Sequence, residues 1–155
     1  MAREEKMSKI IFEIIGIPVA KGRPRFARAG RFVRTYTPDK TRAYESNVLA
    51  QALQHRPPTP IDTAISVDLT FYLPIPASMP KKYQAIAESE TIGVIKKPDL
   101  DNLIKAAIDP LNGVFWTDDS RITHKIARKL YSRNPRTRYI ITYEGGIRNG
   151  RQSAV

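Results

Sequence analysis

The chain has 155 residues, of which 41% are hydrophobic, and carries a formal net charge of +11. This length predicts a single domain over residues 1–155 with one sizeable core, and no apolar run predicts a membrane span or a signal peptide. Because the chain has no cysteine, disulfides and thiolate zinc sites are excluded. We expect a cytoplasmic protein with flexible tails at residues 1–7 and 147–155.

The charge is unevenly divided along the chain. Residues 1–56 hold 12 basic and 5 acidic side chains, residues 57–120 hold 5 and 9, and residues 121–155 hold 9 and 1. An acidic centre between two basic segments suits a polyanion whose phosphates bind the cations while the carboxylates hold a metal ion. A module that only neutralises phosphates would not need the acidic centre.

Residues 8–17 alternate as a first strand, and a cationic segment, residues 19–36, follows. This segment contains six Lys or Arg and no acid, interleaved with aromatic residues and glycines, which predicts a loop outside the core. It is either a solvated linker or a nucleic-acid contact in which arginines bind phosphates and aromatic rings stack on unpaired bases. We favour the contact, with Lys21, Arg23, Arg25, Phe26, Arg28, Arg31 and Arg34 as candidate DNA-binding residues.

Regular elements are predicted on either side of residue 60. A helix is expected with Thr37 as its N-cap and an end near His55. Residues 61–73 give the clearest strand pattern, because apolar and polar residues alternate there. A short helix over 80–90 and a brief extended segment over 92–96 are expected next.

A charged helix is predicted after residue 98. It should start between Asp99 and Asp101, because the proline before them cannot lie inside a helix, and it should end near Asn112. At 3.6 residues per turn, Asp101, Lys105 and Asp109 share one side of this helix, opposite its apolar face.

Five aspartates occur between positions 99 and 119. One can cap the helix, and the line of Asp101, Lys105 and Asp109 can be a solvated ion-pair ladder. Those roles do not use all five, and carboxylates that converge are the oxygen ligands that a hard divalent cation prefers. The candidates are Asp99 and Asp101 at the helix start and the pair Asp118-Asp119 after a turn.

The last third of the chain predicts two strands, over 121–133 and about 138–144. With the earlier strands and helices, they predict an α+β fold with a mixed sheet and helices packed mainly on one side. In the strand 121–133, the residues expected to face the core are Ile122, Ile126 and Leu130, and those expected to face phosphate include Arg121, Lys125 and Lys129.

Several of these blocks resemble the signature of the RusA family of Holliday junction resolvases. The blocks are Lys97-Pro98-Asp99-Leu100-Asp101-Asn102-Leu103-x-Lys105, Asp109-x-Leu111-Asn112-Gly113 and Asp118-Asp119-Ser120-x-Ile122. The run Lys21-Gly22-Arg23-Pro24-Arg25-Phe26 is similar to an N-terminal element of many phage and Gram-positive members.

The resemblance implies a RusA-like α+β fold, a homodimer and a four-way DNA junction as the substrate. It implies metal ligands at Asp99, Asp101 and Asp119, with Asp118 as the alternative third ligand, and a catalytic lysine at Lys105. The implied cofactor is Mg²⁺, with Mn²⁺ able to substitute. Lys97, Lys125 and Lys129 complete the candidate DNA-binding set.

The leading hypothesis is therefore a Mg²⁺-dependent endodeoxyribonuclease that resolves Holliday junctions in DNA recombination and repair. Lys105 would offset transition-state charge or protonate the leaving 3′-oxygen. The alternative is a non-catalytic DNA-binding or regulatory module whose aspartates are structural. A phosphatase-like enzyme is disfavoured, because the chain lacks both D-x-D-x-T after a buried strand and a glycine-rich phosphate loop.

Overall fold

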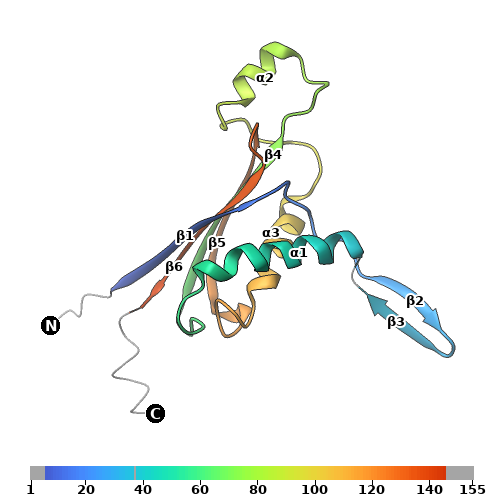
Figure 1. The fold of residues 1–155 in the computed structure, drawn as a ribbon, viewed down its shortest axis with the longest axis vertical. Helices are drawn as coiled ribbons and strands as arrows, with labels where there is room; N and C mark the ends of the chain where they lie inside the picture. The colour runs from blue at the N-terminus through green and yellow to red at the C-terminus, as the bar shows by residue number, and fades with distance from the viewer. Residues whose placement is uncertain (1–5, 37, 146–155) are drawn as a thin grey trace.

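A computed structural model describes residues 6–36 and 38–145 and places a twisted four-stranded sheet behind its helices (Figure 1). The strands of this sheet are β1 (Met7–Ile15), β6 (Arg136–Glu144), β4 (Ile65–Pro74) and β5 (Ile122–Ser132), in that spatial order. β4 and β5 run parallel, and the other neighbours are antiparallel. The remaining elements are a hairpin of β2 (Arg25–Ala29) and β3 (Phe32–Tyr36), the helices α1 (Asp39–Ala52), α2 (Lys81–Ala87) and α3 (Leu100–Ile108), and the 3₁₀ turns η1 (Leu53–His55), η2 (Asp109–Leu111) and η3 (Asp119–Arg121). The predicted α+β class with a mixed sheet is confirmed.

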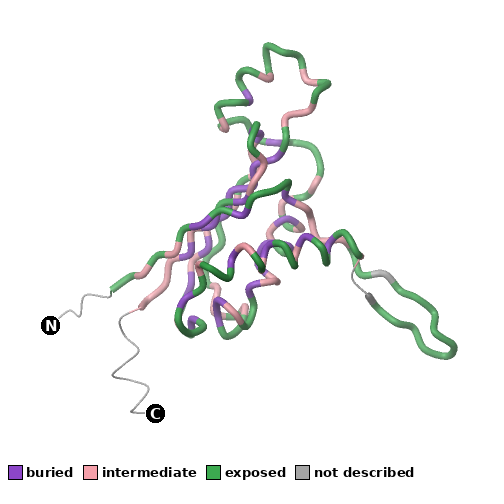
Figure 2. Tube along the Cα trace, viewed as in Figure 1, coloured by how far each residue is buried: buried purple, intermediate pink, exposed green. Residues whose placement is uncertain are grey.

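One face of the sheet carries the core. Phe12, Tyr139 and Leu69 lie side by side across β1, β6 and β4, and all three are at most 4% exposed. α1 packs Val48 and α3 packs Leu103 into the same cluster, so both helices cover this face, as predicted. Figure 2 shows the buried residues concentrated where these helices and the sheet meet. Within the described residues, no helix is long and apolar enough to cross a membrane.

The N-terminal boundaries differ slightly from the prediction. β1 already begins at Met7, so the expected tail 1–7 is too long at its inner end. α1 begins at Asp39, immediately after Pro38. The predicted N-cap Thr37 and the predicted tail 147–155 lie outside the described residues.

The cationic segment 19–36 forms a β-hairpin where a loop was predicted. β2 and β3 pair antiparallel through a two-residue turn, Gly30-Arg31. Gly30 has a φ of +63°, which suits the first position of a tight hairpin turn, where glycine avoids the steric cost of a side chain. The hairpin projects away from the sheet and from α1 (Figure 1). Because it packs against no core, its sequence lacks the apolar alternation that would have predicted strands.

The strand prediction for 121–133 assigned Ile126 and Leu130 to the wrong face of the sheet. The register of β5 on β4 shifts between Ile122 and His124, and this irregularity inserts one extra residue into the alternation. Beyond it, Lys125 and Lys129 lie on the helix-covered side, and Ile126 lies on the uncovered side, where it is 57% exposed. A bulge of this kind leaves no mark in the hydrophobic pattern.

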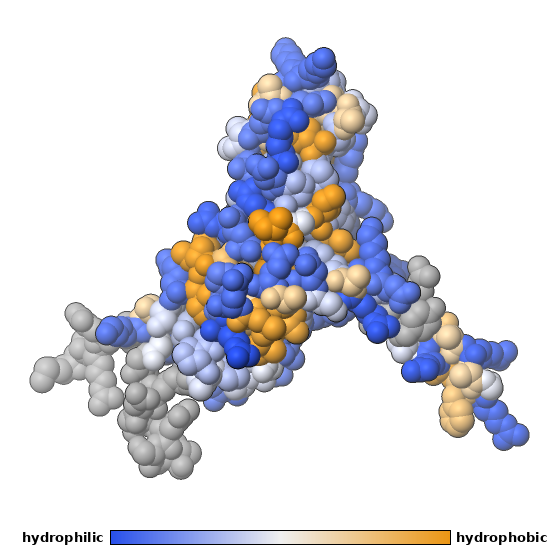
Figure 3. Space-filling model, viewed as in Figure 1, coloured by the Kyte–Doolittle hydropathy of each residue, from blue (hydrophilic) through white to orange (hydrophobic). Residues whose placement is uncertain are grey.

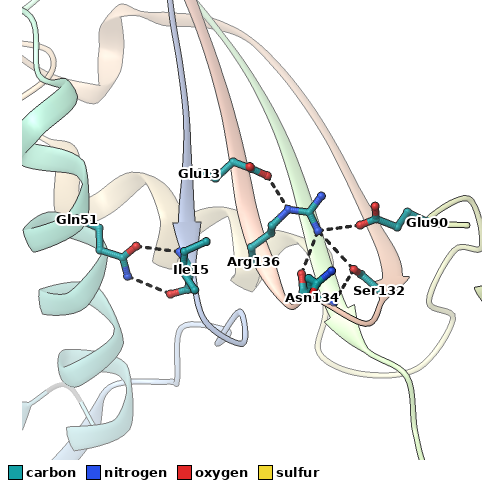
Figure 4. Close-up of polar contacts among 7 residues, drawn as sticks. All are labelled: Glu13, Ile15, Gln51, Glu90, Ser132, Asn134 and Arg136. Carbon is teal, nitrogen blue, oxygen red and sulfur yellow. Dashed lines mark hydrogen bonds and ion pairs between the residues drawn. The ribbon is translucent and has the colours of Figure 1, made fainter. Parts of the chain in front are cut away.

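Polar contacts lock the outer elements onto the sheet (Figure 4). The side-chain amide of Gln51 on α1 forms two hydrogen bonds, of 2.9 and 3.0 Å, with the backbone of Ile15 at the end of β1. Arg136 on β6 donates to Glu13 on β1 and to Glu90 in the loop after α2. These contacts fix the end of the sheet from which the chain turns toward α2.

Candidate active site

The start of α3 presents two carboxylates that the fold does not use. Asp99 stands at the N-cap position in an extended conformation, yet its side chain makes no capping hydrogen bond. Asp101 lies in the first turn, and both side chains are exposed. Leu103 and Ala107 are fully buried on the opposite side of the helix, which fixes the direction in which the acidic side points. A position near a helix N-terminus favours negative charge.

Lys105 shares this exposed side of α3 and also lacks a partner. Within the described part of the chain, Asp99, Asp101 and Lys105 make no side-chain hydrogen bond or ion pair. The ion-pair ladder considered for Asp101, Lys105 and Asp109 is therefore not formed, because Asp109 pairs with a different lysine. The charged side chains at the start of α3 remain available to a ligand.

That lysine is Lys21, which enters from the segment before the hairpin. Its ammonium lies 2.5 Å from Asp109 Oδ2 and 3.2 Å from Glu45 Oε1. Burial lowers the pKa of Lys21, but the hydrogen bonds and charges of the two carboxylates outweigh it, so the pKa lies above its ordinary value. The backbone N–H of Lys21 also donates to the Asn102 carbonyl at 2.9 Å. Lys21 thus ties the cationic segment to α3, and its ammonium is engaged within the protein.

The acidic pair after α3 divides into two different environments. Asp118 Oδ2 accepts the backbone N–H of Ser120 at the start of η3, and the hydrogen bonds from Ser120 lower the pKa of Asp118 below its ordinary value. Asp119 is partly buried, and its Oδ1 accepts the indole N–H of Trp116 at 2.8 Å. One oxygen of Asp119 is therefore fixed by a fully buried ring, which leaves the second oxygen to a further partner.

Three lysines predicted to bind DNA lie close to this helix or on the neighbouring strand. Lys129 donates to the carbonyls of Lys96 and Pro98 at 2.7 and 2.8 Å, so it holds the segment that leads into Asp99. Lys97 and Lys125 are exposed. This role of Lys129 was not predictable, because the carbonyls that bind its ammonium lie about thirty residues earlier in the chain.

The hairpin carries most of the other predicted DNA-binding residues. Phe26, Arg28, Arg31 and Arg34 are exposed on it, whereas the side chain of Arg25 lies outside the described part of the structure. Arg23 lies at the hairpin base, where it helps to line a hollow of about 730 Å³. Pro98 lines the same hollow, which therefore connects the base of the hairpin with the residue before Asp99.

The fit of a metal ion rests on the chemistry of these donors. Among the described residues, no three His, Asp or Glu side chains form a group that could hold a metal ion. Asp119, bonded to Trp116, thus does not complete a three-carboxylate cage with Asp99 and Asp101. Mg²⁺ does not need such a cage, because it is usually bound by one or two carboxylates together with waters and substrate phosphates. The two unengaged carboxylates fit that mode of binding.

Sequence reasoning missed Trp116 as the partner of Asp119. The signal was a lone tryptophan three residues before the second aspartate of the pair, but only the structure shows that its N–H points to that carboxylate.

Two comparisons with known proteins bear on this site. A family model described as endodeoxyribonuclease RusA matches residues 16–142, which include the hairpin, α3 and the Asp118-Asp119 pair. The uncharacterized protein YqaN of Bacillus subtilis (strain 168) is 36% identical over 137 residues, or 87% of this chain and 96% of the relative.

Proposed function

Because the chain belongs to the RusA family of endodeoxyribonucleases, we propose that it resolves Holliday junctions by metal-assisted hydrolysis of phosphodiester bonds. The observation that carries the proposal is the set of unpartnered charges at the start of α3, namely Asp99, Asp101 and Lys105. Exposed charges are often solvated and unpaired, so their arrangement matters more than their lack of partners. Two carboxylates at the start of one helix, with a lysine one turn further on the same side, suit a site that binds a cation and a phosphate together.

The aspartates take the role of metal ligands in this proposal. Asp99 and Asp101 would hold Mg²⁺, or Mn²⁺ in its place, together with waters and substrate phosphate. Asp119 forms no three-carboxylate group with them in the described structure and would serve as the third ligand only through the oxygen that Trp116 does not bind. Asp118 is the weaker candidate, because its carboxylate caps η3. When bound, the cation supplies Lewis acidity at the scissile phosphate and an activated water.

Lys105 acts on the phosphate itself. Its ammonium is exposed on the same side of α3 as Asp101 and is not neutralised by any described carboxylate. A cation positioned beside a phosphate stabilises the charge that develops in the transition state, and it can also donate a proton to the leaving 3′-oxygen. Lys129 supports this geometry indirectly, because it binds the carbonyl of Pro98 immediately before Asp99.

In the proposal, cationic residues of the hairpin and of the segment before α3 bind the junction. Arg23, Arg28, Arg31, Arg34 and Lys97 contact phosphates in the proposal, because each is exposed. A homodimer belongs to it as well, since two symmetry-related sites can cut two opposing strands of a four-way junction. A role in DNA recombination and repair, and a cytoplasmic location, follow from that substrate.

Synthetic four-way junctions test the proposal directly. The protein is incubated with a labelled junction and with a linear duplex of the same arm sequence, in Mg²⁺ or in EDTA. We expect paired nicks in opposing strands of the junction, in Mg²⁺ only, and little cleavage of the duplex. Tight junction binding without cleavage in Mg²⁺ or Mn²⁺ would instead support the DNA-binding module whose aspartates are structural.

A further inference from the structure

The β2–β3 hairpin is an arm that no other described part of the chain covers. Every residue from Phe26 to Thr35 is exposed, and β2 and β3 pair only with each other. Figure 2 shows the arm exposed along its described length, and Figure 3 shows apolar patches among its hydrophilic residues. Phe26 is 72%, Phe32 78% and Val33 65% exposed. An isolated two-stranded hairpin is only marginally stable in water, so large apolar side chains on it indicate a partner.

The register places the two phenylalanines on opposite faces of the hairpin. Residues directly opposite each other in an antiparallel pair share a face, and faces alternate along each strand. Phe26 is paired with Thr35, and Arg28 with Val33, so these four share one face. The other face carries Phe32, paired with Ala29, and Arg34, paired with Ala27. Among the residues whose side chains are described, each face therefore presents one phenylalanine and one arginine.

This two-sided composition limits the kind of partner. Residues 25–36 contain four arginines and no acid, which favours a polyanion as the partner. A β-ribbon that lies in the major groove of one duplex turns one face toward the bases and leaves the other toward solvent. A continuous duplex also offers no open base faces, because its bases are covered by their neighbours. Open base faces on both sides of a ribbon occur where DNA branches.

We propose that the β2–β3 hairpin inserts at the branch point of DNA, with Phe26 stacked on the end of one arm and Phe32 on the end of another. Arg28 and Arg34 then bind the phosphates of the two different arms. The inference deepens the proposed function, on which it rests, by naming the element that selects branched DNA and the surface of the DNA that it contacts.

The segment just before the hairpin is bonded to α3, the helix of the candidate site, and to α1. The N–H of Lys21 binds the Asn102 carbonyl at 2.9 Å, and the N–H of Gly22 binds Thr41 Oγ1 at 3.0 Å. A branch point bound by the hairpin would thereby lie on the part of the chain that leads directly to the helix carrying Asp101. Such an arrangement makes the position of the cut depend on the position of the branch.

Binding measurements in EDTA test the hairpin independently of cleavage. The affinities for a four-way junction and for a linear duplex are measured for wild type, Phe26→Ala, Phe32→Ala and the double variant. Stacking on one base contributes about 1–3 kcal/mol, so each single variant should lower the preference for the junction at least about fivefold, and the double variant more. A 2-aminopurine at the branch point should change its emission with wild type, less with each single variant, and not at all with the double variant.

Matched variants show whether the rings are responsible. Val33→Ala removes apolar surface from the face of Phe26 without removing a ring, and Phe26→Tyr keeps a ring. Both should retain the wild-type junction preference and the 2-aminopurine response. Melting temperatures of all variants should equal that of wild type, because the hairpin packs on no core.

Three results would overturn the assignment. Equal losses for junction and duplex would mean that the ribbon lies in a groove, and an unchanged junction preference would mean that the rings do not stack. A change in oligomeric state, seen by light scattering, would mean that a second copy covers the hairpin. By contrast, a protein that passes these tests in EDTA but never cuts in Mg²⁺ would refute the nuclease and leave the hairpin assignment standing.

Discussion

Around Arg136 every charge has a partner, whereas at the start of α3 three charged side chains have none among the described residues. Arg136 donates to Glu13 at 2.6 Å and to Glu90 at 2.7 Å (Figure 4). Its guanidinium also lies 3.9 Å from the ring centroid of Tyr72. The hydrogen bond from Arg136 lowers the pKa of Glu90, and that bond raises the pKa of Arg136. Asp99, Asp101 and Lys105 make no comparable contact with a described residue.

The difference separates charges that are bonded within the fold from charges that are free to bind the proposed ligand. Removing one member of a satisfied network leaves its partners unpaired, which costs stability. Removing an exposed charge without partners costs little stability, so any large effect must come from the ligand that it binds. Substitutions in the two regions should therefore separate stability from activity.

The largest expected effect is on cleavage, from Asp99→Asn and from Asp101→Asn. Each variant should abolish junction cleavage, because it replaces a negatively charged carboxylate of the proposed metal site by a neutral amide. Junction binding should stay intact or tighten, because repulsion of phosphate is reduced. Cleavage and electrophoretic binding assays are run side by side. Parallel loss of binding and of the melting temperature would show instead that these residues support the fold.

Lys105→Ala should slow cleavage at least about a hundredfold, because a preorganised cation contributes a few kcal/mol to the transition state. The variant should melt and bind junctions nearly as wild type does, since even an exposed ion pair contributes only about 0.3–0.5 kcal/mol. Single-turnover rates at saturating Mg²⁺ provide the measurement. Lys105→Arg keeps the charge but has no proton to give at neutral pH, so its rate separates electrostatic help from proton donation. A rate within about threefold of wild type for Lys105→Ala would remove this residue from the mechanism.

The triple variant of Arg28, Arg31 and Arg34 to Ala should bind duplex and junction more weakly and with less dependence on salt. Each phosphate contact contributes about 0.9 to the slope of log affinity against log salt, so the slope should fall by about 2 to 3. Arg128→Ala is the matched control, because Arg128 is bound to Asp68 at 2.9 Å. If Arg128→Ala changed the salt slope as much per arginine, an arginine paired with a carboxylate of the protein would contact DNA as well as an unpaired one does.

Arg136→Met should lower the free energy of unfolding by about 1–3 kcal/mol without a direct effect on catalysis. It leaves Glu13 and Glu90 without their donor and removes the cation over Tyr72. Chemical denaturation gives the stability, and the cleavage rate of the folded fraction gives the activity. Arg133→Ala, which loses one exposed ion pair with Glu88, should change stability far less.

The smallest effect concerns acid stability. The pKa of Glu90 is lowered by Arg136, so the stability that this pair contributes is present above the unfolded-state pKa of 4.5 and is lost as the pH falls through the lower, folded-state pKa. Glu90→Gln should therefore be slightly less stable than wild type near neutral pH, by a few tenths of a kcal/mol. The two proteins should converge below about pH 4, as melting curves over pH 3–7 would show. A constant difference over that range would rule out the charge as the cause.

Local chemistry made much of the fold predictable. A proline before two aspartates marked the start of α3, and strict alternation marked β4, whose Ile65, Val67 and Leu69 are buried as expected. The family resemblance is confirmed by the match over residues 16–142. The predicted metal ligands and the homodimer stay predictions.

Features that depend on tertiary contacts were not predictable. The bulge after Ile122 moves the following residues of β5 to the opposite face of the sheet from the one predicted, and no residue type in the sequence indicates it. Lys21 looked like a phosphate contact, but its ammonium lies between two carboxylates that are distant in sequence, Glu45 and Asp109. The hairpin was not predicted, because strands that bury no face need no alternation of apolar and polar residues.

Trp116 makes the candidate site visible to spectroscopy. It is the only tryptophan of the chain, it is fully buried, and its indole N–H is bonded to Asp119. Indole emission responds to the electric field along the ring, so a divalent cation held by the other oxygen of Asp119 would shift the emission of the unlabelled protein. A Mn²⁺ or Mg²⁺ titration without DNA would then yield an occupancy curve, and Asp119→Asn would abolish it. Emission that ignores the cation would leave Asp99 and Asp101 as the protein ligands.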